Sequence, residues 1–254
     1  MKGLLDNKMS EWRVCVIIPT YNNARFLPAV LDELLRYTSA IVVVNDGSTD
    51  DTAAVLARYQ SSVAIVTCRK NRGKGDALGK GFEKAGELGY RYAITMDSDG
   101  QHEARDLALF LDALEAHPGA MIIGSRQLKQ ENMPGKNTFA NHFSNFWYAV
   151  QTGRRLPDTQ TGFRLYPLER MKKMRAFTSR YEAELEWLVR AAWRNIPQVT
   201  VPVNVHYLPA GERVTHFRPG VDFLRISLLN TGLVFGAILY GYPSRLIRAL
   251  FQRR

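Results

Sequence analysis

The chain has 254 residues, which is enough for one large α/β domain with a C-terminal elaboration. Lysine and arginine (34) outnumber aspartate and glutamate (24), and the formal net charge of +10 indicates an anionic partner: nucleic acid, an acidic lipid surface or a phosphorylated small molecule. Residues 1–12 lack the apolar run and cleavage site of a signal peptide, which argues against secretion and predicts a cytosolic protein. Cys15 and Cys68 lie in apolar runs without CxxC spacing, so we expect buried thiols rather than metal ligands or nucleophiles.

Apolar, β-branched runs alternate with amphipathic helical patterns through the first half of the chain. We expect buried strands at residues 13–20, 40–44, 63–67, 92–96 and 121–126. Helical patterns separate these strands, and Ser48 with Asp51 resembles a capping box at the start of the second helix. This alternation predicts an α/β fold with a Rossmann-like, mostly parallel sheet flanked by helices.

The second half of the chain continues the pattern. A loop enters a short strand within residues 158–167, a helix is expected at residues 181–195, and a further strand at residues 198–207. The helical pattern at residues 138–150 is unusually aromatic. Two interpretations remain open for it: an aromatic core face, or the wall of a site for an apolar or sugar ligand.

The last part of the chain is apolar and basic. Residues 226–244 carry no charge and are flanked by arginines, and their length is marginal for a transmembrane helix. Asn230, Thr231 and three glycines make this run a poor span, so we expect a helix in the membrane interface with its basic ends on anionic head groups. A single span and a soluble core helix are the alternatives. We therefore divide the chain into a domain at residues 1–218 and an interfacial helical segment at residues 219–254.

Two carboxylates follow directly after the fourth expected strand. Asp97 and Asp99 stand in the run ITMDSDGQH, at the carboxyl end of the strand, where open α/β sheets bind ligands. Carboxylates at this spacing repel each other unless a cation lies between them, and the oxygen set of Asp97, Asp99 and Gln101 suits Mg²⁺ or Mn²⁺. The alternative is an acidic turn in which Asp99 caps the following helix.

A glycine-rich run at residues 71–81 differs from both common phosphate-binding loops. No Ser or Thr follows Lys80, as a P-loop requires, and the spacing is not G-x-G-x-x-G. We expect Gly73 to allow close approach of the backbone to a ligand, with Lys74 offering a cation. After other strands, Asp46 is a candidate to accept hydrogen bonds from a base, and Tyr21 to stack on it.

Six motifs together carry a resemblance to a known family. They are VIIPTYN (16–22), VVNDGSTDDT (43–52), NRGKGDALGKG (71–81), MDSDGQH (96–102), GSR (124–126) and DTQTGFRLY (158–166). In this order and spacing, over roughly residues 13–206, they resemble the family 2 glycosyltransferases of GT-A fold, and within these the dolichyl- or polyprenyl-phosphate mannose synthase branch.

The resemblance implies an inverting transfer of one sugar from a nucleoside-diphosphate sugar, GDP- or UDP-linked, with Mg²⁺ or Mn²⁺. It places Pro19, Tyr21 and Asp46 in the nucleoside pocket. The motif of Asp97, Ser98, Asp99 and Gln101 would hold the metal and the diphosphate. Arg126 and Arg164 would face the phosphates or the acceptor, because guanidinium groups bind phosphate with two hydrogen bonds.

The chain departs from the branch at several positions. The branch usually has two acids where this chain has Asn45 and Asp46, so the donor base stays open. The C-terminal loop of the branch carries an Arg and a Ser-Lys, and here Arg213 and His216 are the candidates to supply those charges. His216 is equally well explained as a surface histidine.

The acceptor decides whether a general base is needed. A lipid phosphate is already ionised, whereas a hydroxyl must lose a proton to a carboxylate. Asp158 is the preferred candidate for this base, and Glu184 is the other; the commoner explanation for Glu184 is a solvated helix acid.

The leading hypothesis is a cytoplasmic enzyme on the inner face of the cell membrane that glycosylates a lipid, either polyprenyl phosphate or a lipid hydroxyl. The alternatives are a soluble transferase acting on a saccharide or protein hydroxyl, and a nucleotide-sugar-binding protein without turnover. A nucleotidyltransferase would carry its glycine-rich signature near the first strand, where this chain has IPTYNN. Nucleic acid is not expected as a partner, because no helix-turn-helix, zinc or RNP pattern occurs.

Overall fold

One mixed sheet forms the centre of the molecule. The computed structural model describes residues 2–126, 135–172, 174, 176–206 and 219–251. Within these, seven strands pair in the order β3-β2-β1-β4-β6-β5-β7. Their bounds are β1 (Val14–Thr20), β2 (Ile41–Asn45), β3 (Ala64–Thr67), β4 (Tyr92–Thr95), β5 (Met121–Arg126), β6 (Arg164–Pro167) and β7 (Gln198–Val203). Only β6 pairs antiparallel among these described strands, with β4 and β5, so the expectation of a mostly parallel sheet is confirmed.

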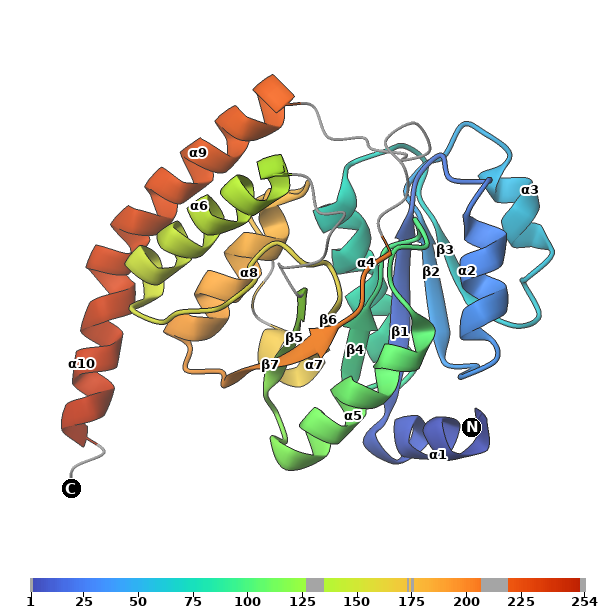
Figure 1. Cartoon of the computed structure of the whole chain (residues 1–254), viewed down its shortest axis with the longest axis horizontal. Helices are drawn as coiled ribbons and strands as arrows, with labels where there is room; N and C mark the ends of the chain where they lie inside the picture. The colour runs from blue at the N-terminus through green and yellow to red at the C-terminus, as the bar shows by residue number, and fades with distance from the viewer. Residues whose placement is uncertain (1, 127–134, 173, 175, 207–218, 252–254) are drawn as a thin grey trace.

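Helices cover both faces of this sheet (Figure 1). One face packs against α1 (Lys2–Trp12), α2 (Leu27–Leu34), α3 (Thr52–Ala57) and α5 (Leu107–Ala116), which follows the 3₁₀ turn η1 (Ala104–Asp106). The other face packs against α4 (Lys74–Glu87), α6 (Gly135–Thr152), α7 (Leu168–Met171) and α8 (Glu182–Trp193). Successive residues of β1 point to opposite faces, and all are buried, because this strand lies inside the sheet with a helix layer on each side. Cys15 and Cys68 are buried free thiols, as expected.

The C-terminal segment is a long helix that runs along the outside of α6 and α8 (Figure 1). It consists of α9 (Pro219–Gly236), a π-helical turn η2 (Ala237–Gly241) and α10 (Tyr242–Phe251). Two glycines bring it onto Trp193 of α8: a Cβ atom at Gly236 would lie 2.7 Å, and one at Gly241 2.6 Å, from atoms of the indole. Its stretch Leu224–Phe251 is long and apolar enough to cross a membrane, with mean hydropathy 1.4, but only 22% of it is buried.

One local prediction and one alternative need correction, and one helix was not expected. The capping box is wrong, because Ser48 Oγ accepts the backbone N–H of Asn22 and Asp51 makes no side-chain cap bond to α3. Asp99 caps no helix either; its carboxylate accepts the N–H of Gln101, and the next helical turn begins at Ala104. The helix α1 was not expected, since its sequence has no clear amphipathic pattern.

The aromatic helix α6 combines core and surface. Tyr148 is fully buried, whereas Phe146 is 59% exposed. The core interpretation therefore holds for Tyr148. The helix α6 also lies beside the C-terminal helix and contacts α9 (Figure 1).

Candidate active site

The carboxyl ends of β1, β2, β4 and β5 bring most of the predicted site residues to one edge of the sheet. Thr20 pairs with Asn45, so Tyr21 and Asp46 emerge side by side from adjacent strands. The loops after β1 and β4 are joined directly, because Asn23 Nδ2 donates to the carbonyl oxygen of Ser98 (2.5 Å) and to its Oγ (3.0 Å). Pro19 is buried within β1. The nucleoside candidates and the acidic motif thus share one edge, as the sequence predicted.

The two carboxylates of the acidic motif titrate differently. Burial alone would raise the pKa of Asp97, but the ammonium group of Lys74 outweighs this effect and lowers it. Burial and the negative charge of Asp97 raise the pKa of Asp99 to about 6. Repulsion between the two groups is therefore incompletely relieved within the protein, and a cation between them would relieve it.

This donor set fits a hard divalent cation. Asp97, Asp99 and Gln101 offer oxygen atoms only, which Mg²⁺ and Mn²⁺ prefer. Across the described parts of the chain, no three His, Cys, Asp or Glu side chains gather as a metal centre. An ion at this motif would therefore depend on two carboxylates, an amide and ligands from the donor itself, as is common for Mg²⁺ bound with substrate phosphates.

Asp46 fastens the glycine-rich loop to the end of β2. Its buried carboxylate accepts the backbone N–H groups of Arg72 (3.1 Å) and Gly73 (2.8 Å), and burial raises its pKa. The sequence predicted that the Asp46 carboxylate accepts hydrogen bonds from the nucleotide base. Part of that accepting capacity is used by the loop instead. Through this loop, Asp46 shapes the part of the sheet edge that the sequence predicted to hold the nucleoside.

The close approach expected between Gly73 and a ligand is instead made by the chain itself. Gly73 has φ +104°, and a Cβ there would lie 2.8 Å from the carbonyl oxygen of Ser179. A Cβ at Gly75 would lie 2.4 Å from that of Ala183 in α8. The missing side chains let α4 pack against the start of α8, and the approach of this loop to a ligand stays a prediction.

Lys74 also forms ion pairs within the protein. Its Nζ lies 2.7 Å from Oδ1 of Asp97 and 2.9 Å from Oε2 of Glu184. Burial would lower the pKa of Lys74, but these two carboxylates raise it. The expected cation is present, and its partners are two acids of the chain.

Asp158 and Arg126 form a buried ion pair. Arg126 donates to Asp158 through Nε (2.6 Å) and Nη2 (3.0 Å), and Asn141 (3.2 Å) and the N–H of Gln160 (3.0 Å) donate to the same carboxylate. Burial would raise the pKa of Asp158, but the hydrogen bonds and charge of Arg126 lower it. A fully buried carboxylate with a lowered pKa and this many donors is a poor general base. The geometry favours an anchoring role for Asp158, and its assignment as the base stays a prediction.

Arg164 does not face a phosphate. Its guanidinium group is fully buried and donates to the carbonyl oxygens of Glu184 (2.7 Å) and Thr159 (2.8 Å). It ties the loop before β6 to α8, so the prediction of a phosphate or acceptor contact is wrong. Arg213 and His216 lie outside the described residues.

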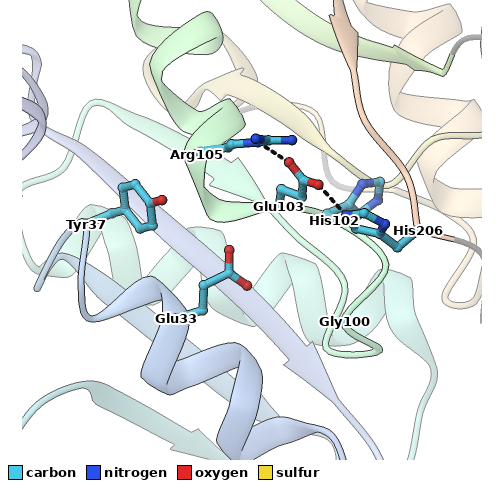
Figure 2. A pocket seen from close by; sticks show the side chains of 7 residues that line it. All are labelled: Glu33, Tyr37, Gly100, His102, Glu103, Arg105 and His206. Atoms are coloured by element: carbon cyan, nitrogen blue, oxygen red, sulfur yellow. Dashed lines mark hydrogen bonds and ion pairs between the residues drawn. The ribbon is translucent and has the colours of Figure 1, made fainter. Parts of the chain in front are cut away.

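A small polar pocket lies behind the acidic motif (Figure 2). Its volume is about 330 Å³, and its lining residues are Glu33, Tyr37, Gly100, His102, Glu103, Arg105 and His206. The Glu103 carboxylate pairs with Arg105 on one side and His206 on the other, and the N–H of His206 donates to the carbonyl oxygen of Gln101 (2.8 Å). These contacts join the loop that carries Asp99 and Gln101 to the segment that follows β7.

Sequence reasoning missed three supporting residues. Asn23 joins two loops, Asn141 donates to Asp158, and the carbonyl oxygen of Gly162 accepts the hydroxyl of Thr95 (2.6 Å). Gly162 stood in one of the six motifs and Asn23 in the run IPTYNN, but neither position indicated these contacts. A buried side-chain amide has no sequence signal of its own.

The fold defines the class of protein. The structure is similar to that of glucosyl-3-phosphoglycerate synthase from Mycobacterium tuberculosis in complex with Mn²⁺, uridine diphosphate and phosphoglyceric acid, with a TM-score of 0.68, 18% identity, and coverage of 93% of this chain and 82% of that chain. This similarity, with the sheet order above, shows the GT-A fold.

The sequence profile of Glycosyl transferase family 2 matches residues 15–173, and the chain belongs to this family of enzymes. Dolichyl-phosphate beta-glucosyltransferase from Homo sapiens is 31% identical over 80% of this chain and 72% of its own length. UDP-N-acetylglucosamine–dolichyl-phosphate N-acetylglucosaminyltransferase from Methanococcus voltae is 27% identical over 89% and 99%. Undecaprenyl-phosphate mannosyltransferase from Micrococcus luteus is 29% identical over 79% and 86%. The resemblance inferred from the six motifs is thereby confirmed.

Proposed function

We propose that this glycosyltransferase moves one sugar, with inversion, from a nucleoside-diphosphate sugar to a polyprenyl phosphate at the membrane surface. We choose a phosphate acceptor because both candidate general bases are already paired with basic side chains. Asp158 is buried against Arg126, and Glu184 is paired with Lys74. An ionised phosphate needs no base, whereas a hydroxyl does. The names of the relatives, which include dolichyl-phosphate and undecaprenyl-phosphate transferases, agree with a lipid phosphate.

The donor site follows from the shared edge of the sheet. Tyr21, Pro19 and Asp46 line the nucleoside end, and Asp97, Asp99 and Gln101 hold a divalent ion at the diphosphate end. Such an ion, when bound, neutralises charge on the leaving diphosphate. The solved relative with Mn²⁺ and uridine diphosphate is a precedent for this combination on the same fold. The nucleotide base and the sugar are left to experiment.

Arg126 is our candidate for the cation that binds an anion in this reaction. Its guanidinium is oriented by the bidentate contact with Asp158, and 15% of its side chain remains accessible. A guanidinium group whose orientation is fixed in this way loses little side-chain entropy when an anion binds to it. We assign it to the phosphate of the acceptor or to the diphosphate.

The C-terminal helix supplies the membrane contact in this proposal. Its outer face exposes large apolar side chains: Leu224, Leu228, Phe235, Ile238, Leu239, Leu246, Ile247, Leu250 and Phe251. Its inner face is fastened to the domain by polar contacts, among them Arg225 with Glu182 (2.6 Å) and Gln151 with Asn230 (2.8 Å). A single transmembrane span would have to break these bonds. They favour a helix that lies on the domain and faces the membrane interface. The cytoplasmic face is our proposal for its location.

A substrate panel tests this function. The purified full chain is offered UDP- and GDP-sugars with Mg²⁺ or Mn²⁺, and polyprenyl phosphate or the matching polyprenol, and products are identified by mass spectrometry. We expect a glycosylated polyprenyl phosphate and no product from polyprenol. Transfer to polyprenol, to a saccharide or to a protein hydroxyl, with none to polyprenyl phosphate, would contradict the proposal.

A further inference from the structure

Lys74 joins three segments that are far apart in the sequence. It is the first residue of α4, and its ammonium group bridges Asp97, after β4, and Glu184, in the first turn of α8. Only 15% of the Lys74 side chain and 9% of the Glu184 side chain are accessible. An ammonium group this buried is stable only with well-placed partners, so the two contacts determine its position.

Gly162 packs closely against the contact between Lys74 and Asp97. A Cβ atom at Gly162 would lie 2.6 Å from Nζ of Lys74 and 2.7 Å from Oδ2 of Asp97. Gly162 cannot move away freely, because its carbonyl oxygen accepts the hydroxyl of Thr95 in β4. Lys74 and Asp97 therefore have little room for another arrangement.

Glu184 is itself fixed at the start of α8. Arg164 donates to its carbonyl oxygen (2.7 Å), and the preceding residue, Ala183, packs into the gap left by Gly75. The carboxylate that holds Lys74 thus belongs to a helix end anchored on both sides. Arg164 is thus one of the residues that hold this helix end.

We infer that Lys74 is a positioning residue of the donor-metal site: held by Glu184, it aims and fixes Asp97 before any metal ion binds. The inference rests on the proposed function, which supplies the ion. The contact between Lys74 and Asp97 is made through Oδ1 of the carboxylate (2.7 Å). Second-sphere partners of this kind orient metal ligands, and their loss typically lowers metal affinity or activity about 10–100-fold.

The test measures Mn²⁺ binding to the purified full chain without donor, from the electron paramagnetic resonance signal of free Mn²⁺. Lys74→Met is expected to weaken binding about 10–100-fold, and Glu184→Gln, which keeps an oxygen acceptor for Lys74, to weaken it less. Lys84→Met is the matched control. Lys84 lies on the same helix and pairs with Glu87, whose side chain is 65% exposed, so its loss should leave Mn²⁺ binding unchanged.

Gly162→Ala separates orientation from charge. The added methyl group would displace Lys74 or Asp97 while every charge is kept, so it should also weaken Mn²⁺ binding. If circular dichroism shows that Lys74→Met does not fold, Gly162→Ala and Glu184→Gln decide the question. Wild-type or tighter Mn²⁺ binding in the folded variants overturns the inference. Failure of the wild-type chain to bind Mn²⁺ would instead contradict the metal site of the proposed function.

Discussion

Replacement of Asp158 tests whether this carboxylate anchors Arg126 or acts as a base. Its side chain is completely buried, and it accepts from both Nε and Nη2 of Arg126, from Asn141 and from backbone N–H groups. Asp158→Ala leaves the guanidinium group buried without its counter-ion, and breaking a buried pair in this way costs about 3–5 kcal/mol. For a chain of this size, about 3 kcal/mol corresponds to a fall in Tm of about 6–12 °C.

Urea denaturation followed by circular dichroism measures this change in the free energy of unfolding. Asp112→Ala is the control, because Asp112 forms an exposed pair with Lys8 (3.0 Å) and its side chain is 66% exposed. Its loss should cost less than about 1 kcal/mol. A general base would behave differently: Asp158→Asn would keep wild-type stability and lose turnover alone, and that result would refute the anchoring role.

Three further predictions concern other parts of the molecule. Burial lowers the pKa of His102 to about 4 from 6.5, so its contribution to stability is complete above pH 6.5 and is lost as the pH falls towards 4. Urea titrations without metal should show wild type losing about 2–3 kcal/mol more than His102→Gln between pH 7 and 4.5. Gly75→Ala should lower the free energy of unfolding by about 1–3 kcal/mol through its clash with α8, whereas Gly79→Ala, with open space at its Cβ, should raise it by up to about 1 kcal/mol. Leu239→Glu should weaken binding to anionic vesicles in a flotation assay, whereas Leu4→Glu on α1 should not.

Each of these has a contrary result. Parallel pH profiles for wild type and His102→Gln would show that the imidazole is not the group responsible. Equal stability of the two glycine variants would contradict the packing of α4 on α8. Equal vesicle binding by the two leucine variants would exclude the outer face of the C-terminal helix as the membrane contact.

The positions of the strands along the chain and the edge that carries the acidic motif were predictable from local patterns. Each parallel strand is a short apolar run, and Asp46, Asp97 and Asp99 follow directly after such runs. Strand ends of a parallel sheet meet at one edge whatever the details of packing, so these residues were correctly grouped. The antiparallel direction of β6 has no such local signal.

The partners of the charged site residues were not predictable. Lys74 and Glu184 are far apart in the chain, and neither neighbourhood indicates that they meet. Arg164 and Asp158 have the residue types of a catalytic site, but burial gives both a structural role. Residue type alone does not distinguish a guanidinium that binds phosphate from one that binds carbonyl oxygens; only the tertiary contacts do.

The central claim is that Asp97 and Asp99 bind the metal ion that receives the leaving diphosphate. Its most direct test is transfer of sugar to polyprenyl phosphate by Asp99→Ala compared with wild type, with Mn²⁺ present or removed by a chelator, and with folding checked by circular dichroism. We expect wild type to form product only with the metal, and the folded variant to form none at any metal concentration. Product from the variant at the wild-type rate, or from chelated wild-type enzyme, would contradict the claim.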